Sequence, residues 1–137
     1  ELVREMVSLA PSAHVFELGE ALGRHDLKSG LATLLDLLAT EHHLPVLAMM
    51  ARHFRLILRI KTRQAALGVS RLGSDEASKL GLHPFVLEKT QGQAASWSWR
   101  SVSEALQSLE EAHRVLVTSA SPPQMVMENL ALKLGRL

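Results

Sequence analysis

Apolar residues recur about every three or four positions along nearly the whole chain, which is the spacing of one face of an α-helix. Strict alternation of apolar and polar residues over the length of a strand is hard to find, and leucine and alanine outnumber the strand-favouring residues. The pattern predicts an all-α, bundle-like domain of about six to eight helices. The expected helices cover residues 1–9, 15–24, 27–40, 44–66, 75–80, 84–95, 99–118 and 123–135.

Residues that break or cap helices stand between these segments. Pro11 with Ser12 separates the first two helices, Asp26 is suited to cap the third, and Gly81 is suited to stop a short one. The stretch 68–74 contains glycine and serine and is the plausible flexible joint of the chain. We therefore expect one domain, with two helical subclusters joined near 68–74.

The segment around Ser98 predicts a capped helix start. Ser98 is expected to be the N-cap, and Trp97 is placed to pack on Val102 as a hydrophobic staple. The helix that follows has one apolar and one polar face. The apolar face holds Val102, Ala105, Leu106, Leu109, Ala112 and Leu116, and the opposite face holds Glu104, Gln107, Glu111 and Arg114. Trp97 is therefore predicted to be structural.

Composition narrows the class of protein. With 137 residues, 47% of them hydrophobic, the chain can fill one sizeable core, and a net charge of +1 gives no overall attraction to nucleic acid or membrane. Cysteine is absent, which excludes disulfides and fits a reducing cytoplasm. No segment has the length and low charge of a membrane span or a signal peptide. Because the chain opens at Glu1 inside an amphipathic pattern, we expect an excised piece of a cytoplasmic protein.

Motifs that carry catalysis or hold ligands are missing from the sequence. There is no glycine-rich phosphate loop followed by lysine and serine or threonine, and no nucleophile motif with a credible base. Among seven histidines, His42 and His43 are adjacent and so point in different directions, and no His-Glu-x-x-His arrangement exists. The sequence predicts no catalytic, cofactor-binding or metal site.

A row of arginines marks the long helix expected over 44–66. Arg52, Arg55, Arg59 and Arg63 follow spacings of three and four residues, so they form one stripe opposite the apolar face. An amphipathic helix needs a solvated polar face in any case, and that is the simpler interpretation. The functional interpretation is a surface for an acidic or phosphate-bearing partner.

Trp99 and Arg100 form a second candidate contact. Trp99 lies in the first turn of its helix, where core packing is the expected role of a tryptophan. If the ring is exposed beside Arg100, it is suited to stack on a nucleobase or on a side chain of a partner. Both interpretations stay open.

The segment 75–95 has the local outline of a helix-turn-helix, with a short helix, a glycine turn and a second helix. A recognition helix must present hydrogen-bond donors to base edges. This second helix opens with Pro84, Phe85, Val86 and Leu87, and it carries Glu88 before its first lysine, Lys89. Packing explains the segment better than DNA reading, so a DNA-binding module remains the alternative.

Taken in order, these segments resemble the delta subunit of bacterial DNA polymerase III, the clamp-opening member of the clamp loader. Each motif alone is a hydrophobic pattern with a turn, whereas their shared order and spacing cover nearly the whole chain. The segments that carry the resemblance are Ala13–Leu18 with Ala21 and Leu22, Ala51–Leu56, Glu76–Val86 with Lys89, Gln93 and Ala94, Trp97 with Ser98, and Leu109–Ala112.

The resemblance implies that residues 1–137 form the C-terminal collar domain, which packs beside the equivalent domains of the other clamp-loader subunits in a hetero-oligomer. It implies no catalytic activity or cofactor for this chain, although the subunit belongs to the DNA-directed DNA polymerase III holoenzyme. It also implies that primed DNA could be bound within the assembled complex. The sliding clamp would be bound only through regions absent from this chain.

Overall fold

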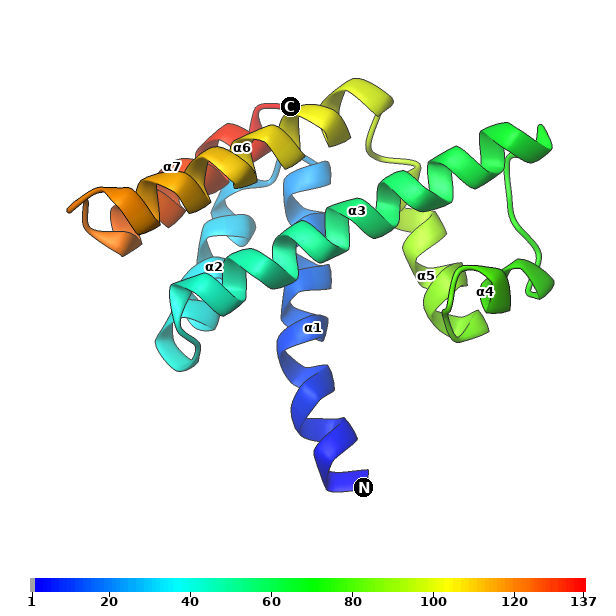
Figure 1. The fold of residues 1–137 in the computed structure, drawn as a ribbon, viewed down its shortest axis with the longest axis horizontal. Coiled ribbons are helices and arrows are strands. Elements are labelled where there is room, and N and C mark those ends of the chain that lie inside the picture. The colour runs from blue at the N-terminus through cyan, green and yellow to red at the C-terminus, as the bar shows by residue number, and fades with distance from the viewer. Residues whose placement is uncertain (1) are drawn as a thin grey trace.

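The computed structural model describes the backbone of residues 2–137 and the side chains of residues 13–137. Within the described residues the fold consists of seven helices and no strand, which confirms the predicted all-α class (Figure 1). The helices are α1 (Leu2–Gly23), α2 (Leu27–Thr40), α3 (His43–Leu67), α4 (Asp75–Lys79), α5 (Pro84–Ala94), α6 (Trp99–Thr118) and α7 (Pro123–Gly135).

The predicted helices over 1–9 and 15–24 are one element, α1, so the break expected at Pro11 was wrong. A proline disfavours a helix interior, but local propensity is a weak guide that the rest of the helix can override. The side chains of residues 1–12 lie outside the described part. The other six segments agree with the prediction to within one residue at either end.

Local capping explains this agreement. Asp26 accepts a hydrogen bond from the Ser29 backbone N–H at 3.2 Å, and Ser98 accepts one from the Ser101 N–H at 3.0 Å. Both side chains satisfy a donor that the first turn of a helix leaves free. At the end of α3, Gly68 adopts a left-handed conformation with φ of 66°, which glycine does without steric cost.

The long helix α3 is the centre of the arrangement (Figure 1). It crosses α1, and α6 packs along it with α7 on the far side of α6. Towards its C-terminal end α3 packs against α5, and the short helix α4 packs on α5. Every helix from α1 to α7 contributes side chains to the buried core. No helix in the described part of the chain combines the length and the apolar character needed to cross a bilayer.

Trp97 lies inside the core, as predicted. It is only 2% exposed, and its ring meets the Phe54 ring edge-on at a centroid distance of 4.9 Å. Val102 is fully buried in the same core, as expected for the partner of a hydrophobic staple. The apolar face of α6 is likewise buried or packed on the core, whereas Gln107, Glu111 and Arg114 are exposed.

Candidate partner-binding surface

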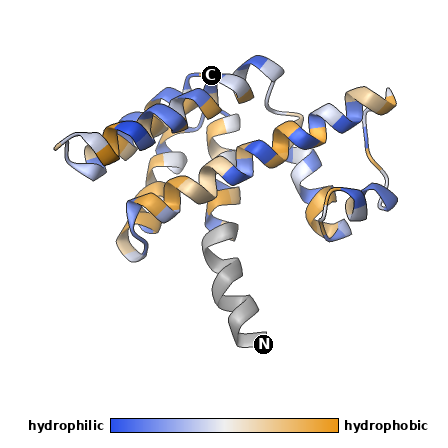
Figure 2. Cartoon of the chain, in the orientation of Figure 1, coloured by the Kyte–Doolittle hydropathy of each residue, from blue (hydrophilic) through white to orange (hydrophobic). Residues whose placement is uncertain are grey.

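The predicted arginine stripe lies along one face of α3, but its four members have different surroundings. Arg52, Arg55 and Arg59 are exposed, whereas Arg63 is half-buried. In Figure 2 the start of α3 is mostly hydrophobic, and hydrophilic residues alternate with hydrophobic ones along the rest of the helix. The stripe therefore exists as a surface only towards the middle of α3.

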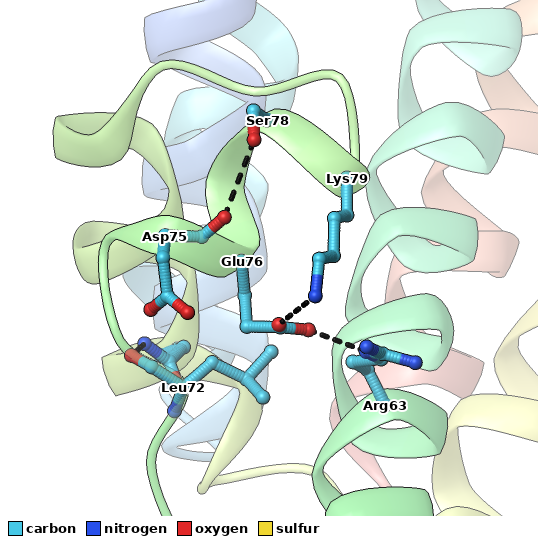
Figure 3. A network of polar contacts seen from close by, with 7 residues as sticks. Arg63, Leu72, Asp75, Glu76, Ser78 and Lys79 are labelled. Carbon is cyan, nitrogen blue, oxygen red and sulfur yellow. Dashed lines mark hydrogen bonds and ion pairs between the residues drawn. The ribbon is translucent and has the colours of Figure 1, made fainter.

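Arg63 is engaged inside the chain. Its guanidinium donates from Nε to Glu76 Oε1, and Lys79 Nζ lies 3.0 Å from the other carboxylate oxygen, Oε2 (Figure 3). Glu76 is 5% exposed, so this carboxylate is held between two cations at a buried position. The hydrogen bond from Arg63, and then that from Lys79, holds the pKa of Glu76 below its ordinary value of 4.5. These contacts fasten α4 to the end of α3.

Arg59 takes part in the same attachment. Its guanidinium donates from Nη2 to the backbone oxygen of Leu80 at 3.0 Å, at the end of α4. Arg52 and Arg55, by contrast, form no ion pair or hydrogen bond with the described residues. Arg52 and Arg55 are thus the two arginines of the predicted stripe that have no partner among the described residues.

The loop 68–74, expected to be a flexible joint, is bound at its centre by Gln91. The Gln91 side chain donates from Nε2 to the Leu72 carbonyl at 3.0 Å and accepts from the Leu72 N–H at 2.6 Å. Gln64 Nε2 also donates to Gln91 Oε1, at 3.0 Å. Leu72 is 4% exposed, so the loop is both packed and hydrogen-bonded to α5. Two subclusters joined near 68–74 stay a prediction.

The side-chain amide of Gln93 fixes α5 to α1 and α3. Gln93 donates from Nε2 to the Phe16 carbonyl at 3.0 Å, and its Oε1 accepts a hydrogen bond from His53 Nε2. The His53 ring also meets the Phe16 ring edge-on at 5.8 Å. Burial lowers the pKa of His53, against the smaller opposing effect of the Gln93 hydrogen bond. Gln93 therefore holds the wall formed by α1, α3 and α5.

Trp99 and Arg100 do not act as one unit in the structure. Trp99 is 49% exposed, so the core packing expected for it does not occur, and Lys61 Nζ lies 5.8 Å from its ring centroid. Arg100 turns along its own helix and pairs with Glu104, with Nε 3.0 Å from Oε1. The exposed ring is thus accompanied by a lysine of α3.

Comparison with known proteins agrees with this geometry. The family described as DNA polymerase III delta subunit, C-terminal domain, matches residues 12–134. The chain belongs to this family. Among solved structures, the Bacillus subtilis DNA clamp loader delta protein is similar, with a TM-score of 0.82 and 25% sequence identity over 93% of this chain. The chain spans 37% of that protein. No match was found among curated proteins.

In this delta C-terminal domain the helix-turn-helix outline is a packing unit. The five-residue helix α4 buries Glu76 and Ala77, and α5 buries Leu87. The packing expected for the start of α5 holds for Leu87 but not for Phe85 and Val86, which are 66% and 39% exposed. The one lysine of α5, Lys89, lies over the Phe16 ring at 4.4 Å.

Sequence reasoning missed the two buried glutamines of α5. Gln91 and Gln93 are 6% and 1% exposed, and both act through side-chain hydrogen bonds to other elements. Polar residues at 91 and 93 lie two positions apart, so they mark no single helix face, and their partners are remote in sequence. In the described part of the chain, no three histidine, aspartate or glutamate side chains come together as a metal site would require.

Proposed function

We propose that this chain is the assembly domain of a clamp-loader delta subunit. In this role it packs beside the equivalent domains of the other subunits, in the cytoplasmic complex that loads the sliding clamp during DNA replication. It performs no catalysis of its own. The observation that carries the proposal is the family match over residues 12–134, together with the shared fold of the Bacillus subtilis clamp loader delta protein.

Exposed apolar side chains support an assembly role. The domain leaves several large hydrophobic residues accessible; single ones are common on soluble monomers, whereas neighbouring ones can mark a contact surface. These residues are Leu35, Leu67, Val69, Phe85, Val86, Trp99, Val117 and Met125. Phe85 and Val86 are adjacent, and Phe85 is the most exposed of the set.

Two cations that have no partner among the described residues support contacts with an anionic partner. Arg52 and Arg55 are exposed on α3 and form no bond with the described residues, so a carboxylate of another subunit or a phosphate of primed DNA can reach them. Trp99 offers an accessible ring for a side chain of a neighbouring subunit, and Arg100 lies next to it. These residues form our proposed contact set beyond the core.

An assembly domain and a DNA-binding module bind different partners, so a binding experiment tests the proposal directly. The chain is mixed with the remaining clamp-loader subunits of the same organism and separated by size, and in parallel it is titrated with duplex DNA at low and high salt. We expect co-elution with the subunits and no salt-sensitive duplex binding. Tight, salt-sensitive duplex binding without co-elution would instead identify a DNA-binding module.

A further inference from the structure

A hollow of about 670 Å³ opens between α1, α3 and α5. Its wall is mainly apolar, and small-molecule sites and helix-binding grooves share this character. The apolar lining is formed by Val15, Phe16, Met49, Leu56, Phe85 and Val86. The hollow is referred to below as the α1/α3/α5 groove.

The rim of the groove holds the most exposed aromatic side chain of the described residues. His83 caps α5 by accepting from the Phe85 N–H at 3.1 Å, and Pro84 occupies the first helical position. This start directs Leu87 into the core and leaves Phe85 and Val86 at the surface, 66% and 39% exposed. An exposed Phe on a rigid, capped helix is a suitable anchor for a partner, because little conformational entropy is lost when it is covered.

The charged side chains that line the groove, among the described residues, are both cations. Arg52 and Lys89 line it, and no carboxylate does so within the described residues. Lys89 lies 4.4 Å from the Phe16 ring centroid, and Arg52 has no bonded partner among the described residues. An apolar trough flanked by two cations is complementary to an apolar segment that carries a carboxylate. A nucleic-acid backbone would use the two cations but would leave most of the aliphatic wall unmatched.

We propose that the α1/α3/α5 groove receives an amphipathic helix from a neighbouring clamp-loader subunit. Its apolar side chains pack on Phe85, Val86 and Met49, and an aspartate or glutamate on its edge pairs with Arg52 or Lys89. This inference rests on the proposed function and adds to it the surface and the chemistry of the partner. The helix-in-groove mode places apolar anchors at helical spacing along the bound helix.

The test compares single variants of the full chain for binding to the remaining clamp-loader subunits, immobilised as a set. We expect Phe85→Ala and Arg52→Glu each to weaken binding by about tenfold or more, since a central anchor and a charge reversal both act directly at a contact. Arg52→Lys should retain more of the binding than Arg52→Glu. Gln107→Ala, which shortens an exposed side chain of α6 that has no place in the proposed contact set, is the control and should change affinity less than about twofold.

The melting temperature of each variant is measured alongside, and we expect no change because Phe85 and Arg52 are exposed. If the parent chain binds the subunits and both variants bind as tightly as the parent, the groove proposal is wrong while the assembly role stands. If the parent chain does not bind at all, the assembly role itself fails. Two further outcomes would overturn the proposal. If the variants keep subunit binding but lose self-association in sedimentation, the groove binds a second copy of the chain. If they keep subunit binding but lose affinity for duplex DNA, the groove binds DNA.

Discussion

The two ends of α3 pack against regions of different chemistry. Around its first half, α1, α2, α6 and α7 supply an apolar bundle in which Leu34, Met127 and Leu134 are fully buried. Beyond its middle lies the corner formed by α4, α5 and the loop 68–74. All the buried polar side chains of the described residues are in this corner, on α4 and α5: Glu76, Thr90, Gln91 and Gln93.

The difference shows how a small domain combines stability with precise placement. Apolar burial is strong but not directional, so the bundle supplies most of the free energy of folding. Buried hydrogen bonds contribute less net free energy, yet they are costly to break and fix geometry. The corner carries Phe85 and one wall of the α1/α3/α5 groove, so its directional bonds hold the surface that we propose for partner binding.

The largest expected effect on the free energy of unfolding comes from a buried leucine of the bundle, compared with its exposed neighbour. Leu34 and Leu35 are neighbours on α2, with exposures of 0% and 43%. Leu34→Ala should lower the free energy of unfolding by about 2–5 kcal/mol, because it removes buried methyl groups and leaves a cavity. Leu35→Ala should change it by less than about 0.5 kcal/mol. Urea denaturation of both variants measures the difference, and equal losses would contradict the packing described for α2.

The next largest loss of stability is expected when the Gln91 side-chain amide, which holds the loop 68–74, is removed. Gln91→Leu removes both hydrogen bonds to the Leu72 backbone and leaves a buried N–H and carbonyl without partners, which should cost about 1–3 kcal/mol. Gln107→Leu on the exposed face of α6 is the matched control and should be nearly neutral. Hydrogen exchange should show the Leu72 amide opening faster only in the Gln91 variant. A Leu72 amide as slow as in the parent chain would show that Gln91 does not fix the loop.

The pH dependence of stability tests the ionic part of the corner. The folded-state pKa of Glu76 lies below its ordinary value of 4.5, so its contribution to stability is complete above about pH 4.5 and is lost as pH falls towards the folded pKa. Glu76→Gln should therefore lower the melting temperature by several degrees at neutral pH, and the gap from the parent should narrow in acid. Glu88→Gln, which disrupts the exposed pair with Arg71, is the control and should show little gap at any pH. If the difference in melting temperature between Glu76→Gln and the parent grew in acid, the predicted pH dependence would be wrong.

The smallest effects on stability are expected for the exposed arginines of α3. Arg55→Ala removes an exposed side chain without a described partner and should leave the melting temperature unchanged. Arg59→Ala removes the hydrogen bond to the Leu80 carbonyl and should cost about 0.5–1 kcal/mol. If Arg55 meets an anionic partner, its variant should still bind the other clamp-loader subunits or primed DNA more weakly. Identical melting and identical binding would leave Arg55 as part of a solvated face only.

The helices could be predicted from the sequence because their signals are local. Asp26, Pro84, Ser98 and Pro123 each act within one turn of the helix that they begin, and the apolar spacing of α6 directly gives its buried face. The family resemblance used the same local segments in order. Pro11 is the exception, since one local signal conflicted with a helix that continues through it.

The contact surface could not be predicted in the same way, because it depends on residues that are distant in the chain. Arg63 and Glu76 are 13 residues apart and Gln91 and Leu72 are 19 apart, so no helical spacing links them. Arg63 therefore resembled a free member of an arginine stripe until the fold placed α4 against it. The groove likewise exists only once α1, α3 and α5 are brought together.

Hydrogen exchange of the chain, alone and mixed with the other clamp-loader subunits, tests the assembly role most directly. The account predicts that backbone amides of α5 and of the facing turns of α3 exchange more slowly in the mixture, and that added duplex DNA alone changes neither segment. The contradictory result would be no slowed amide anywhere in the chain on mixing with the subunits, together with clear slowing of α5 when duplex DNA is added.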